Sequence, residues 1–128
     1  AFCDCGNLKE VTFNEGLQKI GKCAFHNCSS LKRFALPSSV TEIGRFAFWN
    51  CSNLRGVTFN DGLRKIGIFA FTECSSLQSI KLPSTVTEIC FGAFNGCSNL
   101  KEVTFNEGLQ KIGKCAFCSC TSLQNINL

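Results

Sequence analysis

The chain has 128 residues, the length of one domain, and its balance of 45% apolar to 17% charged residues excludes wholesale disorder. It contains no apolar run near the roughly 18 residues of a membrane-spanning helix, and no segment patterned like a secretory signal. The net charge of +4 is too small for a typical nucleic-acid-binding surface. We therefore expect a folded domain with a sizeable core, no specific nucleic-acid binding and no membrane insertion by this segment.

A 23-residue repeat runs through the chain without insertion or deletion. One column of the repeat holds Phe2, Phe25, Phe48, Phe71, Phe94 and Phe117, and another holds Cys5, Cys28, Cys51, Cys74, Cys97 and Cys120. Six further apolar columns keep the same step, among them one that holds Ile20, Ile43, Ile66, Ile89 and Ile112. One unit cannot bury such columns alone, so neighbouring units are expected to stack around a shared core.

Each unit has the same order of local patterns. Within residues 31–36 the apolar Phe34 and Leu36 alternate with Arg33 and Ala35, and this period of two predicts a short strand. A turn of the type Asn-Glu-Gly or Pro-Ser-Ser follows, and residues 40–43 predict a second extended piece that ends at Gly44. The Ala-Phe segment after that glycine is expected to form a single helical turn, and a Cys-Ser corner returns the chain to the next strand.

The repeat pattern L-x-x-V-x-F/L-P/N-x-x-L/V-x-x-I-G-x-x-A-F-x-x-C resembles the Treponema-type, or BspA-like, leucine-rich repeat over essentially the whole chain. Two departures are Cys90 in place of the usual Gly, and Asn-Glu-Gly or Asn-Asp-Gly in place of Pro in alternate turns. The resemblance implies an α/β-type, right-handed solenoid of mostly strands and turns, with a parallel β-sheet on one side. It also implies adhesion and protein recognition, often at the cell surface or outside the cell.

On this interpretation residues 1–128 form a single solenoid domain of about five and a half 23-residue units. The chain opens in the middle of a unit and closes in a strand, without the atypical polar units that normally cap a solenoid. We interpret it as a segment of a longer array, or as a chain whose ends stack on other copies.

The eleven cysteines do not predict a disulfide framework. A parallel ladder points equivalent side chains the same way, whereas a disulfide needs converging Cβ vectors, so we expect a column of buried, reduced thiols. The segment Cys115-x-x-Cys118-x-Cys120 superficially resembles a metal or redox motif. No second Cys/His pair has matching spacing, and His26 lies four units away, so no metal and no cofactor are predicted. Cys3 and Cys118 share an outward column with His26 and are interpreted as surface thiols.

Two surface patterns stand out. The first is a column beside the expected sheet, four of whose six members are cationic: Lys9, Lys32, Arg55, Gln78, Lys101 and Gln124. It either serves solubility and edge protection or attracts an acidic partner, a polysaccharide or a phosphate surface. The second is an apolar cluster of Trp49, Ile68 and Phe91, with Arg45 expected to lie over the Trp49 ring. The cluster is either a docking surface or a set of rings shielded by longer loops.

A third column alternates in sign through Lys19, Glu42, Lys65, Glu88 and Lys111. Opposite charges across a ladder are expected to pair between neighbouring units.

The sequence contains no catalytic set, because its one histidine has no paired nucleophile in its unit and no glycine-rich phosphate loop occurs. The predicted function is a non-catalytic recognition or adhesion module that binds a protein or glycan partner through the repeat surfaces. The alternative is a structural protein whose copies stack end to end into a filament or stalk.

Overall fold

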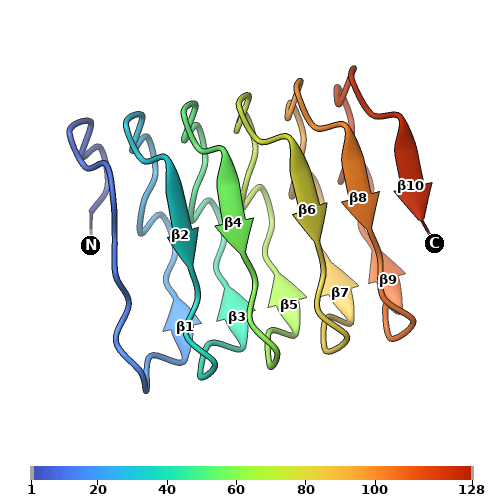
Figure 1. The fold of residues 1–128 in the computed structure, drawn as a ribbon, viewed down its shortest axis with the longest axis horizontal. Coiled ribbons are helices and arrows are strands. Elements are labelled where there is room, and N and C mark those ends of the chain that lie inside the picture. The colour runs from blue at the N-terminus through green and yellow to red at the C-terminus, as the bar shows by residue number, and fades with distance from the viewer. Residues whose placement is uncertain (1, 128) are drawn as a thin grey trace.

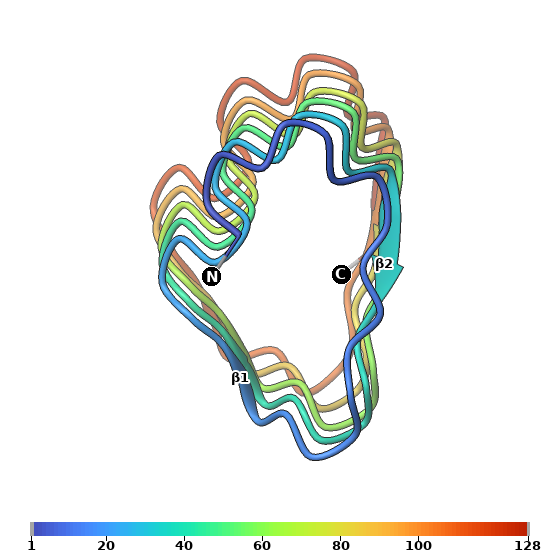
Figure 2. The same cartoon turned by 90° about the vertical axis from the view of Figure 1, so that its left-hand side faces the viewer.

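The computed structural model describes residues 2–127, and the side chains of residues 2–124. The chain winds in coils of closely similar outline, each lying on the one before (Figures 1 and 2). The coils contribute short strands to two walls that face each other across the core (Figure 2), and the first coil joins the second wall only through an isolated bridge at Glu10. The two termini therefore lie at opposite ends of the stack (Figure 1).

The first wall is one continuous parallel sheet of five strands: β1 (Lys19–Ile20), β3 (Glu42–Ile43), β5 (Lys65–Ile66), β7 (Glu88–Ile89) and β9 (Lys111–Ile112). Its register places each isoleucine beside the isoleucine of the next unit, and each charged residue beside one of opposite sign. Lys19 Nζ lies 3.6 Å from a carboxylate oxygen of Glu42. The register confirms the expected alternation of charge along this wall. Lys19 and Glu42 are in addition close enough to form an ion pair.

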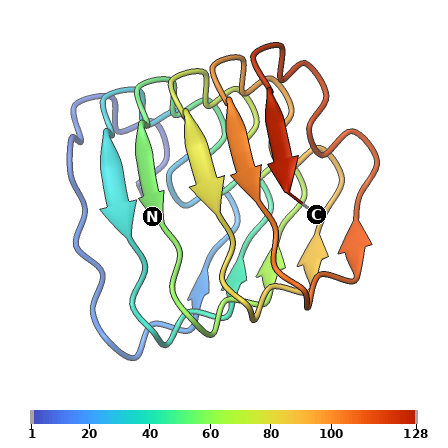
Figure 3. The same cartoon turned by 45° about the vertical axis from the view of Figure 1, so that its right-hand side comes forward.

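The second wall is divided. Strands β2 (Arg33–Ala35) and β4 (Gly56–Thr58) form one parallel pair, and β6 (Ser79–Lys81), β8 (Glu102–Thr104) and β10 (Asn125–Asn127) form a separate three-stranded sheet. β4 and β6 are neighbours along the wall without belonging to one ladder (Figures 1 and 3). Along these strands the apolar residue points inward and its neighbours point out, as in β2, where Phe34 is buried between exposed Arg33 and Ala35.

The space between the walls is filled by the repeat columns. The six phenylalanines of the first column form a stack, with neighbouring ring centroids 5.2–5.5 Å apart and interplanar angles of 2–11°. Phe48, Phe71 and Phe94 in the middle of this stack are fully buried. The end coils are more open, with Phe2 50% and Ile112 45% exposed. The predicted core columns are thus confirmed, and burial is greatest where a coil has a neighbour on both sides.

The cysteine column lies inside this core as free thiols, as predicted. From Cys28 to Cys120 each thiol donates a hydrogen bond to the carbonyl of a column phenylalanine in the preceding unit, as Cys51 does to Phe25 at 3.1 Å and Cys74 to Phe48 at 3.2 Å. Burial raises the pKa of Cys51 to about 12 and that of Cys120 to about 11, because a thiolate would lose its hydration there. These two thiols are therefore structural groups held in the protonated state.

The Ala-Phe corner is where the expectation of a helical turn was wrong. Residues 2–127 contain strands and hydrogen-bonded turns but no helix, and so none that could cross a membrane. At this corner Ala24 N donates to Gly21 O, and Cys28 N donates to Phe25 O. Cys23 and Asn27, each the third residue of such a turn, have φ of 56° and 59°, far from the negative φ of a helix. The α/β-type description is therefore corrected to a parallel β-solenoid.

Candidate functional site

A continuous set of rings covers the outer side of the Ala-Phe corner in the first four units. We call this set, namely His26, Phe46, Trp49, Phe69 and Phe91, the aromatic corner. The rings touch in sequence: His26 to Trp49 at 4.6 Å between centroids, Trp49 to Phe46 at 5.9 Å, Phe46 to Phe69 at 5.4 Å and Phe69 to Phe91 at 5.2 Å. The contacts are tilted, stacked or edge-on, all geometries that aromatic pairs favour.

The backbone holds two of these rings outward at a cost. Phe46 and Phe69 have φ of 58° and 56°, in the left-handed region that bulky residues rarely adopt. The same column has Gly92 in the next unit, with φ of 63°. A Cβ at Gly92 would lie 2.5 Å from Cε1 of Phe69, so this glycine leaves room for the Phe69 ring. Left-handed non-glycine residues cost about 1–3 kcal/mol each and gather at functional sites.

The predicted cluster is partly reproduced and partly corrected. Trp49 and Ile68 are half-buried, and Phe91 is 42% exposed. Arg45 lies over the ring of Phe46, 5.0 Å from its centroid, so the expectation that it covers Trp49 was wrong. That expectation needed residues four apart to share one helical face, and the left-handed residues of this corner turn the chain differently.

Sequence reasoning missed Phe46 and Phe69. Both belong to a column that holds Cys23, Phe46, Phe69, Gly92 and Cys115. The signal that could have found them is Gly92, which marks the column as one of left-handed backbone, together with the neighbouring column of Asp4, Asn27, Asn50, Glu73, Gly96 and Ser119. Asp, Asn and Gly are the residues that tolerate this conformation best.

The second predicted surface lies beside the divided wall. Lys9, Lys32, Arg55 and Lys101 are all exposed, immediately before or at the start of the strand segments. Their backbone groups continue the ladder, since Lys32 N donates to Lys9 O and Arg55 N donates to Lys32 O. The structure thus brings Lys9, Lys32 and Arg55 into adjacent units, whereas Lys101 lies two units beyond Arg55 along the stack.

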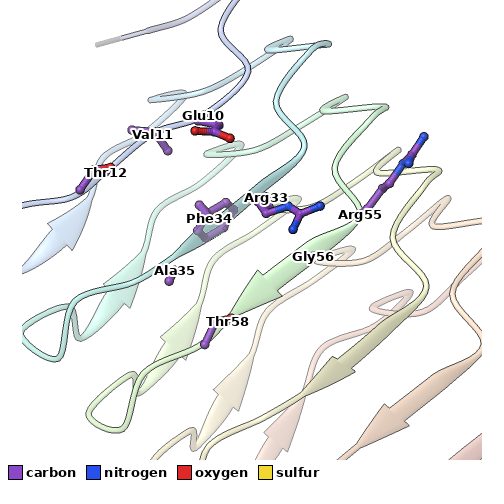
Figure 4. A pocket seen from close by; sticks show the side chains of 9 residues that line it. All are labelled: Glu10, Val11, Thr12, Arg33, Phe34, Ala35, Arg55, Gly56 and Thr58. Carbon is purple, nitrogen blue, oxygen red and sulfur yellow. The ribbon is translucent and has the colours of Figure 1, made fainter.

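A shallow hollow of about 620 Å³ opens on the face of β2 and β4 (Figure 4). Its floor includes the small residues Ala35 and Gly56, and Arg33 extends toward β4 across it, while Arg55 points away from the strand (Figure 4). Gly56 creates much of this space, because the corresponding residues of other units carry side chains. Arg33 was not among the predicted residues.

The arginines of both surfaces carry unpaired charge. Among residues 2–124, side chains of opposite sign come within 4.0 Å only at Lys19–Glu42 and at His26–Asp4. Arg33, Arg45 and Arg55 therefore keep their hydrogen-bond donors free for solvent or for a carboxylate of a partner.

Comparison with known proteins gives a consistent result. A family model described as BspA type leucine rich repeat region matches residues 1–124 in six copies. Similar solved structures include a leucine rich cell surface protein from Faecalibacterium prausnitzii, with 34% identity and a TM-score of 0.88, and the T. pallidum leucine rich repeat protein, with 38% identity and a TM-score of 0.83. A leucine-rich repeat protein from Bacteroides ovatus has 29% identity and a TM-score of 0.74. No curated protein matches the chain.

The similarity covers most of this chain but only part of each relative. The matched regions are 92%, 86% and 91% of this chain, and 31%, 52% and 36% of the three proteins in the same order. The matched region thus spans about a third to a half of the length of these proteins, and the repeat region is what they share.

Proposed function

The chain belongs to the BspA-type leucine-rich-repeat family, and from that premise we propose that it is a non-catalytic recognition module that binds a protein through the aromatic corner. The observation that carries the proposal is the run of touching rings that passes through half-buried Phe46 and Phe69. The turn itself does not require these rings, because other units place Gly or Cys on the same left-handed backbone.

The composition of the surface fits a protein contact. Tryptophan and arginine are the residues most enriched at interface hot spots, and Trp49 and Arg45 both pack against Phe46 here. The rings supply a rigid apolar area, since each is already fixed by a neighbour. Binding would therefore cost little side-chain entropy.

The charges around the rings favour an acidic partner. The column that contains Arg45 and Phe91 also holds Lys22, Ile68 and Lys114, so cations flank the apolar pair of Ile68 and Phe91 on both sides. Lys22, Arg45 and Lys114 are exposed. We propose that the partner presents an apolar side chain ringed by carboxylates, because these would satisfy the free guanidinium and ammonium donors while the apolar group covers the rings.

The test is a double variant, Phe46→Asn with Phe69→Asn. Asparagine tolerates left-handed φ, so it removes the rings while relieving the backbone. We expect the melting temperature to change by a few degrees at most, and capture of the acidic partner from candidate cell-surface proteins to weaken at least tenfold.

The matched control is Leu17→Asn, which removes an exposed apolar side chain in a different part of the coil. It should leave binding unchanged. If the double variant lost much stability and kept binding, the rings would be structural. If instead a glycan bound equally well to wild type and variant, a protein partner at this corner would be contradicted. A further variant replaces the cations beside the divided wall, Lys9, Lys32, Arg55 and Lys101, by Glu. If only this variant lost binding, the binding site would lie at the divided wall and not at the aromatic corner.

A second candidate is stacking of copies through the end coils, in a stalk or filament. It is favoured by the exposure of Leu17 at one end and of Ile112 at the other, since these columns are buried in the middle of the stack. A mass that rises with concentration in sedimentation, and falls on changing Ile112 to Lys, would support it. We also propose that the solenoid is right-handed and that the protein lies at the cell surface, as the name of the F. prausnitzii cell surface protein suggests for this family.

A further inference from the structure

The first coil brings together three side chains that can bind a metal ion. The ligand atoms of Cys3, Asp4 and His26 all lie within 4.8 Å of one another. Cys3 and His26 occupy the same column in adjacent units, so the parallel stacking of coils places the thiol beside the imidazole. Asp4 is joined to His26 by a backbone hydrogen bond of 2.6 Å from Asp4 N to His26 O.

The distances between the ligand atoms suit a metal ion with tetrahedral coordination. Cys3 Sγ lies 3.7 Å from one carboxylate oxygen of Asp4, and His26 Nδ1 lies 3.8 Å from the other. Zinc bonds of about 2.0–2.3 Å to sulfur, nitrogen and oxygen place the ligands of a tetrahedral site about 3.4–3.6 Å apart. The two distances to Asp4 exceed this by only a few tenths of an ångström, and because no two ligand atoms are more than 4.8 Å apart, a movement of about an ångström lets all three share one ion.

The surroundings hold the ligands in place and leave one of them without a partner. Nδ1 of His26 is buried and has no hydrogen-bond partner within the described part of the chain. The side-chain amide of Asn27 donates to Asp4 at 2.9 Å, and the Trp49 ring packs on the imidazole at 4.6 Å. Hydrogen bonds to a ligating carboxylate and an apolar cover are typical of the second layer around metal sites.

We propose that Cys3, Asp4 and His26 form a binding site for zinc or a similar divalent transition metal, with the fourth position open to solvent. Thiolate, imidazole and carboxylate together are a ligand set that zinc accepts, whereas calcium and magnesium prefer oxygen alone. Cys3 and Asp4 are exposed, so an ion can reach the site from solution. An ion here would tie the first coil to the second.

The test uses the full chain with cobalt(II) as a spectroscopic probe and zinc as the competitor. We expect a thiolate-to-cobalt absorption band that saturates at one equivalent and disappears when zinc is added. Cys3→Ser should abolish the band, Asp4→Asn and His26→Asn should weaken binding at least tenfold, and Asn27→Ala should weaken it about tenfold. Asparagine at position 4 keeps a residue that tolerates the φ of 61° found there.

Cys118→Ser is the matched control, because Cys118 is an exposed thiol of the same column at the far end of the stack. It should leave the band unchanged. A band that survives Cys3→Ser, that is lost in Cys118→Ser, or that never forms at micromolar cobalt would overturn the proposal. Binding that is insensitive to both Asp4→Asn and His26→Asn would also overturn it.

Discussion

The stacked rings of the core should contribute to stability as aromatic pairs and not only as apolar volume. Phe71 is the clearest place to test this, because it is fully buried and lies face to face with Phe48 and Phe94, each at 5.2 Å. It also meets Phe59 edge-on at 5.9 Å and stacks with Phe34 at 6.4 Å. Changing Phe71 to Leu keeps most of the apolar surface but removes all four ring contacts.

The magnitude follows from the number of contacts. Aromatic pairs contribute about 0.5–1.5 kcal/mol each beyond the area they bury, so four contacts predict a loss of about 2–6 kcal/mol in Phe71→Leu. Phe2 is half exposed and stacks on one ring, Phe25, at 5.5 Å. Phe2→Leu is therefore the matched control, with an expected loss of about 0.5–1.5 kcal/mol.

Urea unfolding followed by far-ultraviolet circular dichroism measures both losses. The slopes with denaturant should agree between wild type and variants, so that the same surface is exposed in each transition. If Phe71→Leu cost no more than Phe2→Leu, the pairing of rings would contribute nothing beyond apolar volume, and the reasoning would be refuted.

The remaining predictions concern charge, protonation and backbone. Glu42→Lys places like charges in register along the five-stranded sheet and should lower the free energy of unfolding by about 0.5–1 kcal/mol at low salt. The loss should disappear in 1 M salt, which screens the charges. It should also be absent in Glu107→Lys, because Glu107 lies outside that column. Because burial raises the pKa of the Cys51 thiol from 9.0 to about 12, this thiol loses its proton at lower pH in the unfolded chain than in the folded one. The free energy of unfolding should therefore fall as the pH rises above 9. The fall between pH 8 and pH 10 should be smaller in Cys51→Ala than in the wild type. Gly92→Ala should displace the Phe69 ring, and a change in the aromatic proton shifts of that ring by nuclear magnetic resonance checks this.

The spacing of apolar residues was enough to predict the stack and its core. The strand expected within residues 31–36 appears as Arg33–Ala35, and the extended piece at 40–43 contains Glu42–Ile43. These elements follow from a period of two and from columns that only stacking can bury. Parallel stacking also points every cysteine side chain of the column the same way, which is why these thiols could be predicted not to form disulfides.

The Ala-Phe corner could not be predicted from local pattern. Its conformation depends on backbone bonds to the next coil, such as Phe25 N to Ala47 O at 2.7 Å, which no single unit contains. Those bonds hold residues such as Phe46 in a conformation that their own propensity opposes. The wrong prediction of a helical turn also led to the wrong prediction for Arg45, which a helical spacing placed over Trp49 instead of Phe46.

The backbone hydrogen bonds between coils at that corner all run in one direction, which gives the corner an electrical polarity. Within one unit Cys23 N donates to Arg45 O and Phe25 N to Ala47 O, and in the next unit Phe48 N donates to Ala70 O, always from one coil to the coil that follows it. Strand dipoles in sheets largely cancel, but here the peptide dipoles add as they do along a helix. At this corner the face toward higher residue numbers therefore presents N–H groups and the opposite face presents carbonyls. Two such stacks meeting face to face would attract each other head to tail and repel each other head to head.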